Sequence, residues 1–361
     1  MAAYSRRDAD FQPELRKNVV TREWVIISKG RGRRPSDFVQ QSAGNAAAPA
    51  HDDSCPFCPG NEQQTPPEVF SLHRTGSAKA GEWQVRVVPN RFAALRPDAP
   101  DIQRQIGIHS WRDGHGAHEV VIESPLHNKD LWELSNSDVE AVIEAYRQRY
   151  LAFESVESLQ HVLIFRNRGP AAGTSLDHPH SQLIAAPVVS RYLRTELEGA
   201  AVFWEYLGKC VFCALIEDEA KQGERVVSES EHFMVITAYA GRYPFETWIL
   251  PKRHSIRFAA ITEEEASALA RVLKDTLRRL AETLNRPSYN FAIHTALPAE
   301  HNVRAYHWHM EVYPRVTTPG GFELGSDVYI NVVAPEEAAE VLRTAEAPLV
   351  PSAGSASQKP R

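Results

Sequence analysis

The chain has 361 residues, of which 43% are hydrophobic and 24% charged, which is enough for two domains of ordinary size. A net charge of −6 argues against broad nucleic-acid binding, and no apolar stretch approaches the length of a membrane span. No apolar export signal follows Met1, so we expect a protein of the cytoplasm, where cysteine thiols stay reduced.

The elements expected in chain order form two similar series. The first contains a Cys-x-x-Cys pair, strands over 85–90 and 118–125, a helix, a strand over 161–165 and a His-x-His pair. The second repeats this order with strands over 233–236, 246–251 and 289–294. Capping boxes are expected at both helix starts, from Ser137 with Glu140 and from Thr262 with Glu265. The chain therefore reads as a duplicated module.

This repetition predicts an α+β fold of two tandem domains, each an antiparallel sheet with packed helices. We place the N-terminal domain at residues 1–187 and the C-terminal domain at residues 188–346. Residues 347–361 are rich in Ser, Ala and Pro and are expected to form a disordered tail.

All four cysteines fall in the two Cys-x-x-Cys pairs, and each pair is followed at long range by histidines in the same order. Paired cysteines in a reducing compartment are typical of metal ligands or redox couples. Four such ligands with no open position are typical of structural zinc, so we expect two zinc ions per subunit. The predicted ligands are Cys55, Cys58, His127 and His178 in the first half, and Cys210, Cys213, His254 and His307 in the second.

The segment His178-Pro-His180-Ser-Gln182 follows a loop of small residues over 169–177. From their spacing of two residues on an extended segment we expect the two imidazoles to face opposite ways, so that His178 can bind metal while His180 stays free as a nucleophile toward phosphorus. In the second half His309 occupies the equivalent position, but Glu311 replaces the amide of Gln182. A carboxylate there would repel phosphate groups, which favours the first half as the reactive one.

Taken together, these motifs resemble the galactose-1-phosphate uridylyltransferases of the histidine-triad superfamily, from Arg22 to about Arg343. The family motif HPHGQ appears here as HPHSQ over 178–182. The resemblance implies that His180 attacks the α-phosphorus of a UDP-sugar and that Gln182 stabilises the intermediate. The implied ping-pong reaction converts UDP-glucose and galactose 1-phosphate into glucose 1-phosphate and UDP-galactose.

The resemblance also implies substrate contacts and a homodimer. It assigns Arg31 and Arg34 to the diphosphate or sugar phosphate, which guanidinium groups bind through two oxygens at once. It assigns Asn90 to the nucleotide, and Asn167, Gly173 and Ser175 to phosphoryl oxygens. The segment that reads the hexose, often across a dimer interface, would be residues 320–331, with Phe322, Glu323, Asp327 and Asn331 as candidate contacts.

Several alternatives stay open at this point. Some family members build the second metal site from a Glu and three His, here Glu196, His294, His307 and His309, but we favour the set with two cysteines. A phosphorylase of ADP-glucose, another nucleotide sugar or a dinucleoside polyphosphate would use the same His180 with inorganic phosphate as acceptor. A non-catalytic nucleotide-binding module would form no covalent adduct.

Overall fold

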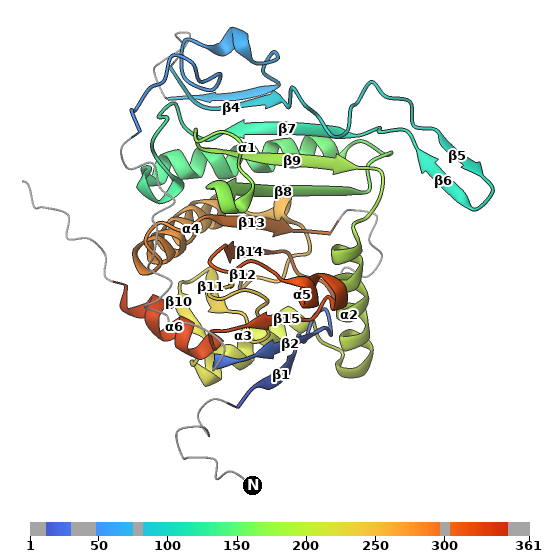
Figure 1. Ribbon diagram of the computed structural model, residues 1–361, viewed down its shortest axis with the longest axis vertical. Coiled ribbons are helices and arrows are strands. Elements are labelled where there is room, and N and C mark those ends of the chain that lie inside the picture. Colours follow the sequence, from blue (N-terminus) through green and yellow to red (C-terminus); the bar gives the residue numbers. More distant parts are fainter. Residues whose placement is uncertain (1–11, 30–47, 75–81, 297–303, 346–361) are drawn as a thin grey trace, which may run out of the picture.

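A single ten-stranded antiparallel sheet runs through the molecule, and both modules contribute five strands to it (Figure 1). The structure is a computed structural model and describes residues 12–29, 48–74, 82–296 and 304–345. The strand order is β10-β11-β12-β14-β13-β8-β9-β7-β4-β3. The predicted α+β class is confirmed, and the two module sheets are joined edge to edge by the antiparallel pairing of β8 with β13.

The two halves of this sheet mirror each other in strand order, as the duplication predicts. The strands of the first half are β3 (Phe70–His73), β4 (Trp83–Pro89), β7 (Ala117–Ile122), β8 (His161–Arg168) and β9 (His180–Ala186). Those of the second half are β10 (Val226–Glu229), β11 (Phe233–Thr237), β12 (Thr247–Pro251), β13 (Tyr289–His294) and β14 (His309–Pro314).

The long helices α1 (Asn136–Glu154) and α4 (Glu263–Thr283) lie side by side on one face of the sheet (Figure 1). Their apolar stripes, which include Val142 and Tyr146 in α1 and Leu273 and Leu277 in α4, are buried in one continuous core. The opposite face of the sheet is therefore left uncovered by these two helices.

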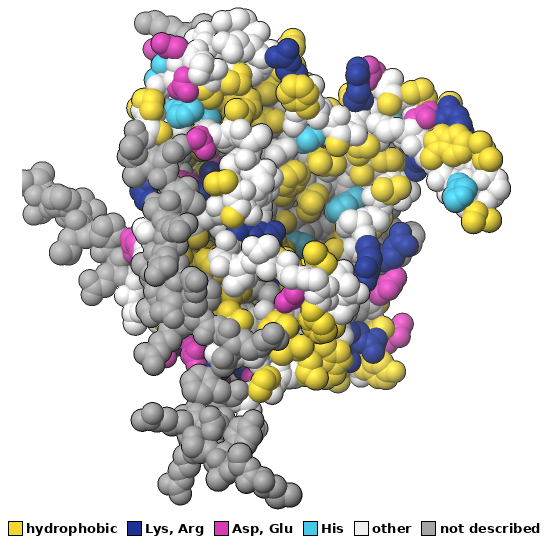
Figure 2. Space-filling model, in the orientation of Figure 1, with side chains coloured by type: hydrophobic (Ala, Val, Ile, Leu, Met, Phe, Trp, Pro, Cys, Tyr) yellow, Lys and Arg dark blue, Asp and Glu magenta, His cyan; other side chains and the backbone are white. Residues whose placement is uncertain are grey.

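Several elements lie outside the duplicated pattern. The helices are α2 (Arg191–Leu207), α3 (Val211–Gln222), α5 (Gly321–Ser326) and α6 (Pro335–Thr344). Short 3-10 turns are η4 (Glu62–Gln64), η5 (Leu131–Glu133), η6 (Pro170–Ala172) and η7 (Phe258–Ala260). A hairpin of β5 (Gln103–Ile106) and β6 (His109–Arg112) projects from the body with Ile106, Ile108 and Trp111 exposed (Figure 2).

A small three-stranded sheet joins the two ends of the described chain. It contains β1 (Glu14–Lys17), β2 (Trp24–Ile27) and β15 (Tyr329–Asn331), and β15 pairs in parallel with β2. Val25 and Ile27 pack against Ala240 and Ala334, so these first strands lie with the second module although they precede the first. The tail predicted over 347–361 lies outside the described residues.

No single helix in the described ranges combines the length and apolar composition of a membrane span. The pair α2 and α3, bent by 75° at the break between them, passes that test only when its two helices are taken together.

The start of α4 was predicted correctly and the start of α1 was not. Thr262 and Glu265 form the expected capping box of α4. The N-cap of α1 is Ser135, whose Oγ accepts the backbone N–H of Asp138, so the predicted cap at Ser137 is wrong. Both serines fit the capping pattern, and the extended backbone at Ser135 decides between them.

We expect Ser135→Ala to lower the free energy of unfolding by about 1 kcal/mol, because the amide of Asp138 in the first turn loses its acceptor. Ser137→Ala is the matched control and should leave stability nearly unchanged. Urea denaturation followed by circular dichroism measures both. An equal loss in the two variants would contradict the assignment of the cap.

Candidate active site

His180 is the first residue of β9, and its imidazole lines a pocket of about 470 Å³ together with Asn90, Ser175 and Gln182. The neighbouring Ser181 points to the helix-covered face, where its Oγ accepts the hydroxyl of Tyr146 at 2.6 Å. The alternation of β9 thus places His180 and Gln182 on the face away from α1.

The tautomer of His180 follows from one hydrogen bond. Its Nδ1 lies 2.8 Å from the carbonyl oxygen of His178, and because a carbonyl only accepts, Nδ1 must carry the proton. Nε2 therefore presents its lone pair. Burial lowers the pKa of His180, which keeps the ring neutral and nucleophilic.

The expectation that His178 and His180 face different ways holds, but their spacing is not the cause. Side chains two residues apart in a regular strand share a face. The rings diverge because β9 begins only at His180, and His178 lies before Pro179, outside the strand. His178 is fully buried, and its Nε2 donates to the carbonyl oxygen of Ser124 at 2.8 Å.

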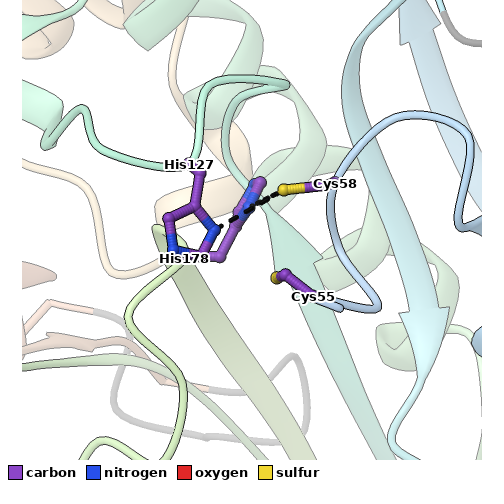
Figure 3. A group of neighbouring side chains, drawn as sticks. All are labelled: Cys55, Cys58, His127 and His178. Carbon is purple, nitrogen blue, oxygen red and sulfur yellow. Dashed lines mark hydrogen bonds between the residues drawn. The ribbon is translucent and has the colours of Figure 1, made fainter. Parts of the chain in front are cut away.

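Cys55, Cys58, His127 and His178 converge on one point, as Figure 3 shows. The Sγ of Cys58 lies 3.5 Å from Nδ1 of His127 and 3.6 Å from Nδ1 of His178. Ligand atoms on a tetrahedral zinc ion lie about 3.5 Å apart, given bonds of about 2.0–2.3 Å. Burial raises the pKa of the Cys55 thiol to about 11, a cost that a bound cation would offset. The four residues fit a metal ion.

A second group of the same composition contains Cys210, Cys213, His254 and His307. The Sγ of Cys213 lies 3.4 Å from Nδ1 of His254 and 3.6 Å from Nδ1 of His307. These distances match those of the first group, and His307 is likewise fully buried. The residues of this group also fit a metal ion.

Glu196, His294 and His309 form a third group, whose ligand atoms lie within 4.8 Å of one another. The sequence had presented two competing sets that shared His307. In the structure the sets separate, because the Nδ1 of His307 faces Cys213 while the other three residues cluster on their own. Either group can therefore form without the other.

His309, the counterpart of His180, has no free nitrogen. Its Nδ1 lies 3.2 Å from the carbonyl oxygen of His307, and its Nε2 lies 3.3 Å from Glu311 and 3.4 Å from Glu196. Burial alone would lower the pKa of His309, but the two carboxylates raise it to about 10. Both nitrogens are therefore engaged, which leaves none free for nucleophilic attack, and the ring of Trp248 lies beside it with centroids 5.4 Å apart.

The predicted phosphate-binding loop lies beside His180. Ser175 lines the pocket of His180, and Asn167 lines a smaller adjoining pocket that His180 also borders. Asn290 of β13 donates to Oδ1 of Asn167 at 2.7 Å and to the carbonyl oxygen of Ala172 at 2.9 Å, so the second module holds this loop. Gly173 has φ +82°, which favours glycine.

The other predicted substrate contacts are not gathered there in the described chain. Arg31 and Arg34 lie outside the described residues. Phe322 and Glu323 line a different pocket, of about 630 Å³, and Asp327 pairs with Arg191 on the surface. We had also expected Asn331 to contact sugar. It is buried, and its amide donates to the carbonyl oxygens of Gly241 and Tyr243, which ties β15 to the loop between β11 and β12.

Two residues of the pocket and one residue beside it went unnoticed in the sequence. Phe57, between the first two cysteines, packs edge-on to His180 with ring centroids 5.5 Å apart. Phe92 lines the same pocket with 85% of its side chain exposed, and His118 bonds to Gln182. Only Phe57 had a signal, since Phe212 stands at the same place in the second Cys-x-x-Cys pair.

Comparisons with known proteins agree on one family. The family model for the galactose-1-phosphate uridyl transferase N-terminal domain matches residues 2–190, and that for the C-terminal domain matches residues 189–349. ADP-glucose phosphorylase of Arabidopsis thaliana is 37% identical over 92% of each chain. The galactose-1-phosphate uridylyltransferase of Thermotoga maritima is 28% identical over 92% of this chain and 98% of its own.

A solved structure agrees with these matches. The crystal structure of the Arabidopsis thaliana ADP-glucose phosphorylase with bound ADP-glucose superposes with a TM-score of 0.79 at 35% identity, over 93% of this chain and 99% of the other. The duplicated module, the reactive imidazole and these matches lead to one conclusion: the chain belongs to the galactose-1-phosphate uridylyltransferase family of the histidine-triad superfamily.

Proposed function

We propose that this protein is a nucleotide-sugar phosphorylase that acts through a nucleotidyl intermediate on His180. In the first step Nε2 of His180 attacks the α-phosphorus, the bond to the bridging oxygen breaks, and sugar 1-phosphate leaves with that electron pair. In the second step an oxygen of inorganic phosphate attacks the same phosphorus. The phosphorus–nitrogen bond breaks, which releases the nucleoside diphosphate and free His180.

One observation carries this proposal: the imidazole of His180 is locked in the tautomer that aims its free Nε2 into a ligand-sized pocket. The leaving group is already a phosphate, so the step needs positioning and charge stabilisation more than acid catalysis. Ser175 and Gln182 supply hydrogen-bond donors in that pocket, and exposed Phe92 offers a ring on which a nucleobase can stack.

The choice of acceptor and nucleotide rests on similarity. The 37% identity to an ADP-glucose phosphorylase supports inorganic phosphate as acceptor and ADP-glucose as donor. The reaction first expected from the sequence, transfer of UMP from UDP-glucose to galactose 1-phosphate, is the second candidate, because uridylyltransferases match nearly the whole chain at 28% identity or less. Both reactions share the first step and differ in the second.

We further propose that each of the two Cys2His2 groups holds a structural zinc ion, as their ligand spacing supports. Zinc bound by His178 would fix the segment whose carbonyl orients His180, while the second ion would tie α3 to the end of β12 and to His307. Such sites need thiolate ligands, so this proposal includes a reducing compartment such as the cytoplasm.

The proposed assembly is a homodimer. Phe322 and Glu323 lie in a pocket that shares no residue with that of His180. If they read the sugar, as the family resemblance implies, they would do so in a partner's active site.

We expect the purified protein to gain the mass of AMP when mixed with ADP-glucose, and to lose it when inorganic phosphate is added. UDP-glucose and galactose 1-phosphate are tested in parallel by intact-mass spectrometry. His180→Asn should abolish the adduct because the attacking nitrogen is gone, and His309→Asn is the matched control that should retain it. A UMP adduct discharged only by a sugar phosphate would favour the second candidate, and a label on His309 would overturn the mechanism.

For the metal sites we expect about two zinc ions per chain from the four-ligand rule for closed sites. Cys210→Ser should remove one ion and leave the adduct on His180 intact, whereas Cys58→Ser should remove the other ion and slow adduct formation. Glu196→Gln should leave the zinc content unchanged. Elemental analysis measures the zinc content of each variant, and the adduct assay measures nucleotidylation of His180. Full zinc content in Cys210→Ser would shift the second site to Glu196, His294 and His309.

For the homodimer we expect subunit mixing to restore turnover. His180→Asn and Phe322→Ala proteins, each weakly active or inactive alone, should recover activity when refolded together, because some mixed dimers keep one complete site. Sedimentation velocity gives the size of the particle. A monomer, or mixtures no more active than their parents, would count against assembly of the site from two subunits.

A further inference from the structure

His118 connects the loop after β4 to the side-chain amide of Gln182, which lines the same pocket as His180. It lies on β7, diagonal to Gln182 on the neighbouring strand β9, and its Nε2 is 2.7 Å from Oε1 of Gln182. Its Nδ1 is 3.1 Å from the backbone nitrogen of Ala94, in the loop that follows β4. Both ring nitrogens of His118 are therefore occupied.

The direction of these bonds is fixed by the backbone. The N–H of Ala94 can only donate, so Nδ1 of His118 must accept and the proton resides on Nε2. Nε2 then donates to Gln182, and the atom that receives this bond must be the amide oxygen. The amide nitrogen of Asn90 lies 3.1 Å from Nε2 of His118 and 3.5 Å from the same oxygen of Gln182. Because Nε2 carries a proton, the Asn90 amide can donate only to that oxygen.

The amide nitrogen of Gln182 is left available for a ligand in the pocket. It makes no hydrogen bond to another residue in the described part of the chain, and Gln182 lines the same pocket as His180. A carboxamide is nearly symmetric in shape, so without a partner it could also turn its oxygen toward the pocket. That orientation would place a partial negative charge against a phosphoryl group.

We propose that His118 is a positioning residue, which holds the amide of Gln182 with its NH2 group toward the phosphoryl group transferred to His180. This inference rests on the proposed function, since it concerns the same covalent intermediate. His118 acts only through Gln182 in this role. Its second contact, with Ala94, both selects its tautomer and holds the loop of Asn90 and Phe92, whose own turn is closed by a bond from the Phe92 N–H to Oδ1 of Asn90.

Two substitutions separate the contacts of His118. Asn places an oxygen near the position of Nδ1 and keeps the bond from Ala94, but it cannot reach Gln182. Gln places an NH2 near the position of Nε2 and keeps the bond to Gln182. His118→Asn should slow adduct formation on His180 by about 10- to 100-fold, as for a misplaced transition-state donor. His118→Gln should recover most of that rate while requiring a higher ADP-glucose concentration.

A double-mutant cycle tests whether His118 acts through Gln182. Gln182→Ala alone should slow adduct formation by about 100-fold, and adding His118→Asn should change that rate by no more than about twofold. His73→Asn, an exposed histidine outside the site, is the matched control. Rates come from quenched-flow intact-mass measurement on the full chain, and circular dichroism checks folding. Should His118→Asn fail that check, Ala94→Pro, which removes the tautomer-selecting N–H, takes its place with the same expectation.

If the two substitutions slowed adduct formation independently, so that their factors multiplied in the double variant, the role of His118 would be overturned while the proposed function stayed intact. A normal rate of adduct formation in His118→Asn would have the same consequence. Absence of any adduct in the unsubstituted protein would instead overturn the proposed function, and the role of His118 with it.

Discussion

The hydrogen bond from Nδ1 of His180 to the carbonyl oxygen of His178 is the contact on which the site depends. It decides which nitrogen carries the proton and which one faces the pocket. The carbonyl is itself held in place, because the imidazole of its own residue is buried among the first cysteine pair and bonded to Ser124. The placement of a candidate metal ligand and the orientation of the His180 imidazole are thus set by the same three residues, 178–180.

A buried ion pair in the sheet also stabilises the strands around this segment. Arg166 and Glu123 form a buried ion pair with atoms 2.9 Å apart, and Arg166 also contacts Asp130. The carboxylates offset the desolvation of the guanidinium, and its pKa stays raised. Because Arg166 lies on β8 and Glu123 follows β7, the pair links the strands that flank β9 on either side.

The two halves place equivalent imidazoles in different surroundings. Both halves place an imidazole at the start of the equivalent strand, with its Nδ1 near the carbonyl two residues earlier. Their surroundings then diverge: Gln182 leaves the first ring neutral and accessible, whereas Glu311 and Glu196 pair with the second and Trp248 covers it. The second ring therefore has no nitrogen left for nucleophilic attack, because Glu311 stands where the first half has Gln182 and Glu196 of α2 adds a second carboxylate.

Much of the sheet and the grouping of metal ligands could be predicted from the sequence, since alternation and the repeated Cys, Cys, His, His order are local or periodic signals. The pairing of β8 with β13 could not, because both strands are apolar and nothing local marks a shared edge. His118 had no signal either, because its contacts are with Ala94 in the loop after β4 and with Gln182 on β9, which are distant from it in the sequence. The burial of Asn331 could not be predicted either, because its partners lie about 90 residues away in the sequence.

The parallel pairing of β2 with β15 also constrains the order in which the molecule can be completed during synthesis. About 300 residues separate β2 from its partner, which begins at Tyr329, so the ribosome must polymerise all of them before the two strands can meet. Lys29 lies two residues after the end of β2 and just before the arginine-rich segment of the sequence. Its ammonium group pairs with Glu337 of α6. The anchor of that segment is therefore assembled last, after the sheet that carries His180 can already have formed.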